Sequence, residues 1–597
     1  MILGAIGLQI LCAKSFSACG ILALSWVGTL GIVIVSAVAT TWIIRGASHG
    51  EIQRFVAPWK SCVPWIFVLL LVLQLSLYPP MMSDSLSYRL PRIFLALQAG
   101  HTGEVASPDV RMNTMPWGWE SLALPFALVN WIGGARLINL ACWCLAYQLV
   151  TFLAAGRGIS NSKARWIGLA LCSAPFLLLQ GSSTANDLFA SVMLLAGGAL
   201  MFSFRGHLGP VPVLGSLLGL LLASSAKPQF LTLGLPWLFW WATAPGQPWK
   251  QVRWQWLAAA CPVFVAVSPL PLLFTQLLQT GALGGDAVGG GESSGWVTMV
   301  GAGLLQSTVA QAQLPVFPGA DWLSGQIGSL PILSSISQSL PKFEPRVTTV
   351  PLIDEASFGA IHFSILVVWL WMGVVRCGRF GWVWLACVTA AFLFACSQVF
   401  VATMGRSFAG YGFALFPLAI LGASRMSGSR WFRSLCGVAI LTGFATLVVN
   451  PSAPLWPARD FRARAESAGS EALVSKLDKY LSYQERARTG RGILSPVPGG
   501  EPVAILVRPV TPILALWQPD WRSHQIDYVN HLPVEDFLKS DRNWLVVAAN
   551  AEQSHPSAFA LYSSLPGWSV VSEQTYLPNI RQGGETWRLY RRSNIGD

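Results

Sequence analysis

Five charged side chains stand at the ends of long apolar segments, where ionisable groups are scarce. They are Asp84, Asp187, Lys227, Glu355 and Arg406. An ionisable group at membrane depth is costly unless it faces a cavity or a partner, so each of the five is a candidate functional group. Asp187 is the only charge in its apolar segment, and Lys227 lies alone on its loop.

Carboxylates and cationic side chains that lie together are suited to a reaction at a phosphate group. Asp84 and Asp187 could deprotonate an acceptor hydroxyl, or hold a divalent cation such as Mg²⁺ or Mn²⁺. Lys227 could neutralise a phosphate as a point charge, and Arg406 could do so through its bidentate fork. A set of this kind at one membrane face predicts a lipid-linked phosphate as substrate. For any single residue, the alternative of an interfacial anchor that extends to water stays open.

Apolar blocks dominate the chain up to residue 450. Hydrophobic residues make up 53% and charged residues 11% of the 597, and the charged share is about half that of a soluble globular protein. Since ~20 helical residues span the bilayer core, the chain is predicted to be an α-helical polytopic membrane protein. We expect about twelve spans, near residues 17–44, 63–80, 134–154, 163–180, 188–204, 210–225, 229–245, 255–277, 360–376, 381–403, 409–424 and 432–449.

Positive charge falls in every second short loop, which predicts the orientation. Lys and Arg are enriched in cytoplasmic loops, so the basic loops should lie inside. The long loops at 81–133 and 278–359 should then face outward from the inner (plasma) membrane. The basic loops are 45–60, 157–165, 205–207, 250–253, 376–379 and 425–433.

The composition changes after residue 450. Short β-branched runs, Val503–Val507 and Trp544–Val547, alternate there with polar stretches and a helical segment at 466–483. We therefore expect a transmembrane catalytic domain at 1–450 and a small extracytoplasmic α/β domain at 451–597.

Charge and cysteine content exclude other classes. The net charge of +12 has a simple explanation in the cytoplasmic loops, and no basic face with stacking aromatics predicts nucleic-acid binding. The eleven cysteines all lie within or beside apolar segments, without a zinc or disulfide pattern. The N-terminus is apolar at once, which predicts an uncleaved membrane segment.

The first outward loop carries the motifs that point to a family. It reads SDSLSYRLPR at 83–92, LQAG at 97–100 and MPWGWE at 115–120. An Asp just past a membrane helix, followed by Tyr, Pro-Arg and Gln-x-Gly, resembles the first periplasmic loop of bacterial GT-C glycosyltransferases, including protein mannosyltransferase-like members. The resemblance implies that Tyr88, Arg89, Arg92 and Glu120 bind substrate. Members of that family often carry His where this chain has Arg89. The difference bears on which acceptor or carrier group the loop binds.

Further motifs follow in the family's order. The segment 180–187 ends in Asp187, SAKP at 225–228 contains Lys227, 354–362 contains Glu355, and Arg406 begins a late span. The similarity extends over roughly residues 63–450, through short motifs whose order and topology make them specific. It implies that Lys227, Glu355 and Arg406 bind the substrate or its phosphate.

The resemblance implies a GT-C-like fold and an inverting glycosyl transfer at the extracytoplasmic face. The donor would be a polyprenyl-phosphate-linked sugar, and the acceptor could be a glycan, lipid or protein hydroxyl. Asp84 would be the general base or a metal ligand, Asp187 would support it, and cations would stabilise the leaving phosphate. Two other classes stay open. A lipid or lipid-linked sugar flippase predicts charges and broken helices near the mid-bilayer, and an envelope-assembly scaffold predicts no clustering of charges.

Overall fold

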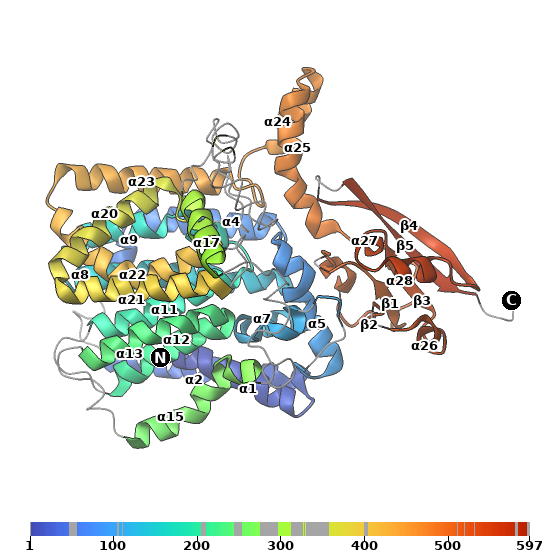
Figure 1. The fold of residues 1–597 in the computed structure, drawn as a ribbon, viewed down its shortest axis with the longest axis horizontal. Helices are drawn as coiled ribbons and strands as arrows, with labels where there is room; N and C mark the ends of the chain where they lie inside the picture. The colour runs from blue at the N-terminus through green and yellow to red at the C-terminus, as the bar shows by residue number, and fades with distance from the viewer. Residues whose placement is uncertain are drawn as a thin grey trace.

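The chain folds into a bundle of apolar helices with a small sheet domain at its C-terminal end, as expected (Figure 1). The computed structural model describes residues 2–46, 56–103, 107–109, 111–203, 210–243, 254–274, 296–311, 326, 329, 357–398, 404–509, 511–518, 520–530, 532–579 and 583–593. Most of the outward loop expected at 278–359, including Glu355, lies outside the described residues.

A helix occupies each apolar block predicted from the sequence. In the described residues, six helices are long and apolar enough to cross a membrane, or seven if the bent pair α9 and α10 is one span. The other apolar helices are shorter, so the count of twelve stays a prediction. The helices are α1 (Ile2–Ala18), α2 (Ser25–Gly46), α4 (Cys62–Leu77), α8 (Arg136–Ala155), α9 (Asn161–Cys172), α10 (Pro175–Gly181), α11 (Asn186–Ser203), α12 (Pro210–Ala226), α13 (Gly234–Thr243), α15 (Trp254–Val267), α17 (Trp296–Gln311), α20 (Ala360–Cys377), α21 (Arg379–Gln398), α22 (Met404–Met426) and α23 (Arg430–Val448).

Close packing of α20 against α22 fixes the helix that carries Arg406. A Cβ atom on Gly373 would clash with the carbonyl oxygen of Leu418, and one on Gly422 would clash with that of Trp369. Small residues allow apolar helices to approach this closely in membranes, where packing rather than hydrophobic burial drives association.

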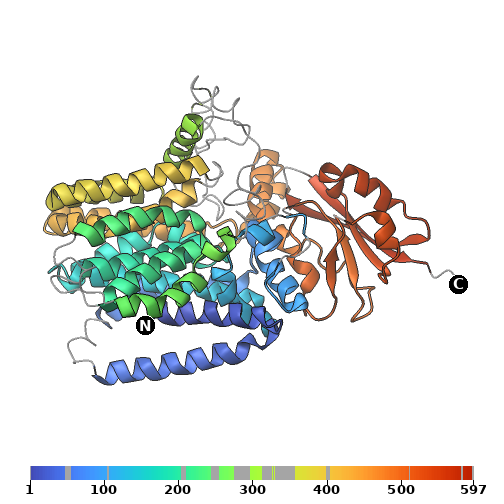
Figure 2. The ribbon, with the colours of Figure 1, turned by 60° about the horizontal axis from the view of Figure 1, so that its bottom comes forward.

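The first outward loop (81–133), so named for its expected orientation, is mostly helical. A π-helical turn (Ser85–Arg89) runs directly into α5 (Leu90–Ala99), and α6 (Arg111–Thr114), α7 (Gly118–Leu128) and a 3₁₀ turn (Ile132–Ala135) follow. Figure 2 shows this segment between the bundle and the sheet domain. The loop therefore forms a structured layer between the bundle and the sheet domain.

The C-terminal domain is a mixed five-stranded sheet with helices. The strand order is β2-β1-β3-β5-β4, with β1 parallel to β2 and β3, and β5 antiparallel to β3 and β4. Val503 of β1 lies opposite Ile526 of β2 and Trp544 of β3. The elements are α24 (Ala458–Ser467), α25 (Glu471–Glu485), β1 (Val503–Leu506), a 3₁₀ turn η9 (Leu514–Trp517), β2 (Ile526–Tyr528), α26 (Val534–Leu538), β3 (Trp544–Ala548), α27 (Ala551–Ser554), α28 (Pro556–Ser563), β4 (Trp568–Asn579) and β5 (Gly583–Arg592).

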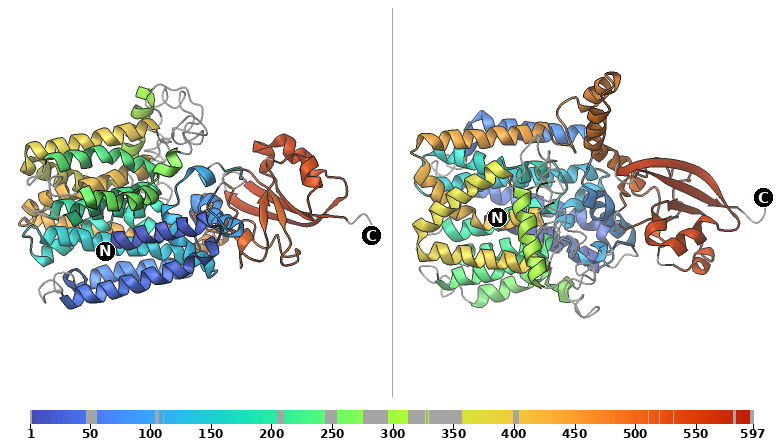
Figure 3. Two further views of the ribbon diagram at one scale, coloured as in Figure 1. Left: turned by 90° about the horizontal axis from the view of Figure 1, so that it is seen from below. Right: turned by 45° about the horizontal axis from the view of Figure 1, so that its top comes forward.

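The two faces of this sheet belong to different cores. Ala504 and Leu506 pack with Phe537 of α26 and Tyr562 of α28. The alternate residues of β1 belong to the same buried cluster as the helical bundle, because successive side chains of a strand point to opposite faces. The sheet domain is thus packed on the outward loop (Figure 3).

The orientation of the C-terminal domain is a prediction that cysteine labelling can check. Ser470 is exposed at the start of α25 and its side chain makes no cap hydrogen bond. In a cysteine-free background, Ser470→Cys should react with a membrane-impermeant maleimide in intact cells, because the last basic loop is expected inside. Ser160→Cys, at an equivalent exposed cap in an expected cytoplasmic loop, should react only after lysis. The reverse pattern would overturn the topology.

Candidate active site

Four charged residues predicted from separate helix ends meet in one cluster. Arg406 Nη1 lies 3.6 Å from Asp84 Oδ2 and 3.8 Å from Asp187 Oδ2. Lys227 Nζ lies 2.8 Å from Asp187 Oδ1. Because Arg406 reaches both carboxylates, Asp84 and Asp187 are neighbours, although 103 positions separate them in the sequence.

Asp187 is held at the start of α11. The Gln180 side chain donates to Asp187 Oδ2 at 3.3 Å and accepts from the Leu188 N–H at 2.7 Å. A carboxylate in the first turn also interacts favourably with the helix dipole. Asp187 is therefore fixed in position before any substrate arrives.

Lys227 is placed by the end of α12. Pro228 follows it, and a residue before proline is pushed out of the helical region, so Lys227 is extended with φ −140° and ψ 95°. The Asn186 side chain donates to the Ala226 carbonyl at 2.8 Å. This bond ties the start of α11 to the end of α12 and holds Lys227 beside Asp187.

Arg89 joins three segments of the site. It is fully buried, and its guanidinium lies 3.9 Å from Asp84 Oδ2 and 3.5 Å from Glu120 Oε1. It also donates to the Thr184 carbonyl at 3.1 Å and to the Tyr88 hydroxyl at 3.1 Å. The arginine thus links the first outward loop to the loop before α11.

Two residues of the cluster were not singled out in the sequence. Arg111 Nη1 lies 2.9 Å from Asp84 Oδ1, and its Nη2 lies 2.6 Å from Asp109 Oδ2. The Arg111 guanidinium also stacks 4.2 Å above the Tyr88 ring. The sequence did contain a signal for these two residues, an Asp-x-Arg pair between the LQAG and MPWGWE motifs. Only the fold brings this pair next to Asp84.

Arg92 has a different environment from the other predicted cations. It is fully buried, donates to the backbone carbonyls of Met115 and Pro116 at 3.0 and 3.3 Å, and stacks 4.1 Å above Trp117. These contacts join α5 to the segment before α7. A substrate role for Arg92 stays a prediction.

The electrostatics of the cluster favour an anion. Burial alone would raise the pKa of Asp84, but Arg406, Arg111, Arg89 and Lys227 together lower it to about 2. The side chains of Asp84, Arg111 and Lys227 are 20, 23 and 18% exposed, so the cluster is reachable from solvent. Five cations and four carboxylates give it a net charge of +1: Arg89, Arg92, Arg111, Lys227 and Arg406 against Asp84, Asp109, Glu120 and Asp187.

A divalent cation would have to compete with these ion pairs. The described part of the chain has no group of three or more His, Cys, Asp or Glu side chains that could hold a metal ion. An ion shared by Asp84 and Asp187 would displace Arg406 from between them. The donor set therefore fits a bound anion better than a resident divalent cation.

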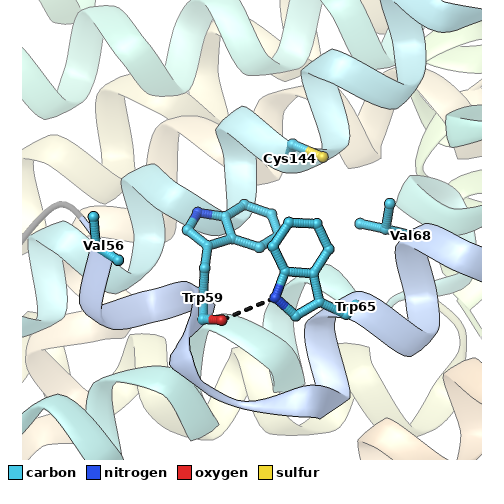
Figure 4. A pocket seen from close by; sticks show the side chains of 5 residues that line it. All are labelled: Val56, Trp59, Trp65, Val68 and Cys144. Atoms are coloured by element: carbon cyan, nitrogen blue, oxygen red, sulfur yellow. Dashed lines mark hydrogen bonds between the residues drawn. The ribbon is translucent and has the colours of Figure 1, made fainter.

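Two cavities lie apart from the charged cluster. One, of about 370 Å³, is lined by Val56, Trp59, Trp65, Val68 and Cys144 near the start of α4, whereas Asp84 follows the other end of that helix (Figure 4). Its lining has no charged group to bind a phosphate. The other, of about 410 Å³, lies between the outward loop and the C-terminal domain, and its lining includes Phe94, Trp131, Arg491 and Trp517.

The fold and the site define a polytopic membrane protein with a charged cluster at one end of its helices. No family model matches the sequence, and no curated protein matches it. Two solved structures of ArnT from Cupriavidus metallidurans are similar, one in the apo state and one bound to undecaprenyl phosphate. The TM-scores are 0.47 and 0.48 at 14% identity, over 92 and 91% of this chain and 98% of ArnT. At this identity the similarity is one of chain path.

Proposed function

We propose that the protein is a GT-C-type glycosyltransferase that moves a sugar from a polyprenyl-phosphate carrier to an acceptor hydroxyl at the extracytoplasmic membrane face. The observation that supports it is the single cluster in which Arg406 bridges Asp84 and Asp187 beside Lys227. A site that combines a candidate base with cations suited to phosphate has what this reaction needs. A fold alone would not specify that activity.

The reaction would be an in-line displacement with inversion. The acceptor oxygen forms a bond to the anomeric carbon while the bond from that carbon to the phosphate oxygen breaks. The acceptor proton passes to Asp84, and the electron pair of the broken bond leaves with polyprenyl phosphate. Lys227 and Arg406 would stabilise the phosphate as its negative charge grows, and Asp187 would hold both cations in place.

Donor binding would also activate Asp84. With its present cation partners, Asp84 has a pKa of about 2 and would be a weak base, because a general base works best with a pKa near the operating pH. A donor phosphate would compete with the carboxylates for Arg406 and Lys227. Weaker pairing with these cations would raise the pKa of Asp84 in the bound complex.

This mechanism predicts different pH profiles for two kinetic constants. Acid protonates Asp84 and removes the base, so both constants should fall on the acid side. The acid limb of kcat/KM reports the free enzyme and should lie near the low pKa of Asp84, about 2. The limb of kcat, which reports the bound complex, should lie at higher pH. Between pH 4 and 8, kcat should therefore fall on the acid side while kcat/KM stays nearly constant. A kcat that does not fall in this range, or a kcat/KM that falls together with it, would contradict the mechanism.

A flippase is the second candidate, and one observation favours it. Helices α9 and α10 form a broken pair bent by 75°, as a transport pathway predicts. The charges, however, lie at helix ends. Asp187 and Arg406 stand in the first turns of α11 and α22, and Lys227 directly follows α12. The sequence-based expectation for a flippase placed them near the mid-bilayer.

Transfer with purified protein separates the two candidates. The protein in detergent would receive a polyprenyl-phosphate sugar and an envelope fraction from cells that lack it, and we expect sugar incorporation together with released polyprenyl phosphate. Movement of the carrier across vesicles, without release under any acceptor, would overturn the proposal. The same assay tests the predicted use of a metal by Asp84 and Asp187, since dependence would appear as loss with EDTA and recovery with Mg²⁺ or Mn²⁺.

A further inference from the structure

The π-helical turn of the first outward loop, Ser85–Arg89, contains a backbone carbonyl that the turn itself cannot pair. In a π-helix the N–H of residue i+5 donates to the carbonyl of residue i, and the Leu90 N–H donates to the Ser85 carbonyl here. The next donor in this pattern would be residue 91, which is proline and has no N–H. The carbonyl of Leu86, a buried residue, therefore needs a donor from another part of the chain.

The C-terminal domain supplies that donor. The Ile513 N–H donates to the Leu86 carbonyl at 3.0 Å. Ile513 directly precedes η9, whose last residue, Trp517, stacks on Phe94 of α5 with ring centroids 6.0 Å apart. The domain thus contacts both the π-turn and the helix that continues it.

Gln98 strengthens the same contact from the loop side. Its side-chain nitrogen donates to the carbonyls of His524 and Trp521 at 2.7 and 3.2 Å, and its oxygen accepts from the Ile526 N–H at 3.4 Å. All three partners are backbone groups: Ile526 is the first residue of β2, and His524 and Trp521 lie in the segment before it. The Gln98 amide therefore recognises a backbone shape in the C-terminal domain rather than a particular side chain.

We propose that the C-terminal domain holds the first outward loop in its π-helical register, with Gln98 as a positioning residue and the Ile513 N–H as the donor that completes the turn. The inference depends on the proposed function for its catalytic consequence. If the contact is lost, the Leu86 carbonyl loses this donor and the register of the turn can shift, and each residue of register rotates a helix by about 100°. In the structure the π-turn places Tyr88, Arg89 and Asp84 together. After a shift of register, Tyr88 and Arg89 would turn away from Asp84.

Two variants test this proposal by their separate and combined effects. Gln98→Ala should lower kcat about 10- to 100-fold, the cost of a small misplacement of catalytic groups, with little change in the donor KM. Pro91 opposes an α-helical register, because it has no N–H for the Ser87 carbonyl and its ring would clash with that carbonyl. Adding Pro91→Ala removes this opposition, so the double variant should lose more kcat than Gln98→Ala alone. Pro91→Ala alone should stay within about twofold of the parent. Gln553→Ala, at a glutamine of the C-terminal domain that pairs with Arg508, is the control.

Hydrogen exchange of the segment 83–99, measured without donor, separates this proposal from the proposed function. Exchange there should rise in Gln98→Ala and rise further in the double variant. Unchanged exchange in Gln98→Ala, or no further rise on adding Pro91→Ala, would overturn the positioning role whatever the enzyme does. This pattern of raised exchange in a protein that transfers no sugar would support the positioning of the loop and count against the proposed function alone.

Discussion

Asp84→Asn is expected to abolish sugar transfer while the protein stays folded. Asparagine keeps the size of the side chain and can still accept a hydrogen bond from Arg111, which lies 2.9 Å from Asp84, but it cannot take a proton. General-base assistance is worth about 10²- to 10⁴-fold, so turnover should fall by at least this range. Release of polyprenyl phosphate, measured with detergent-purified protein, gives the rate directly.

The control for this variant is a carboxylate outside the cluster. Asp536 is 60% exposed and pairs with Lys539 on the surface of the C-terminal domain, so Asp536→Asn should leave turnover unchanged. Near-normal turnover by Asp84→Asn would remove Asp84 from the mechanism. Equal losses of turnover and of folded protein would instead assign it a structural role, as the ion pairs with Arg89 and Arg406 allow.

The second large effect is expected for the two cations beside Asp187. Lys227→Met and Arg406→Met should each lower kcat by about 10²- to 10³-fold, the usual effect of removing a group that stabilises charge in the transition state. Carrier binding should weaken much less, because a leaving phosphate carries more negative charge in the transition state than in the bound complex. Separate measurements of sugar transfer and of carrier binding give this comparison.

A flippase would show the opposite pattern. There, each substitution would impair carrier binding or movement across the bilayer, and even the parent protein would form no glycosidic bond. Lys539→Met removes a positive charge that is 78% exposed and should change neither constant. Failure with a single acceptor would not decide between the classes, so several envelope acceptors belong in the assay.

The sequence predicted the members of the site better than their arrangement. Asp84, Asp187, Lys227 and Arg406 stood out because a charge next to an apolar segment needs a reason. That Arg406 lies between the two carboxylates depends on how α22 packs against α20 and α11. Arg111 was missed for the same reason, since an arginine in a polar loop is ordinary until the fold brings it to Asp84. Glu355, which the sequence also predicted to bind the substrate, lies outside the described residues.

By itself, the sequence determined the apolar helices, the change of composition near residue 450 and the mixed α/β character of the C-terminal domain, because hydropathy and turn residues act over a few neighbouring positions. Only the tertiary structure decided that the Ile513 N–H donates to the Leu86 carbonyl and that the Gln98 side chain forms hydrogen bonds with the backbone at the start of β2. These contacts join residues more than 400 positions apart. Such pairs form only when the helices and the sheet pack together, so no local pattern in the sequence could predict them.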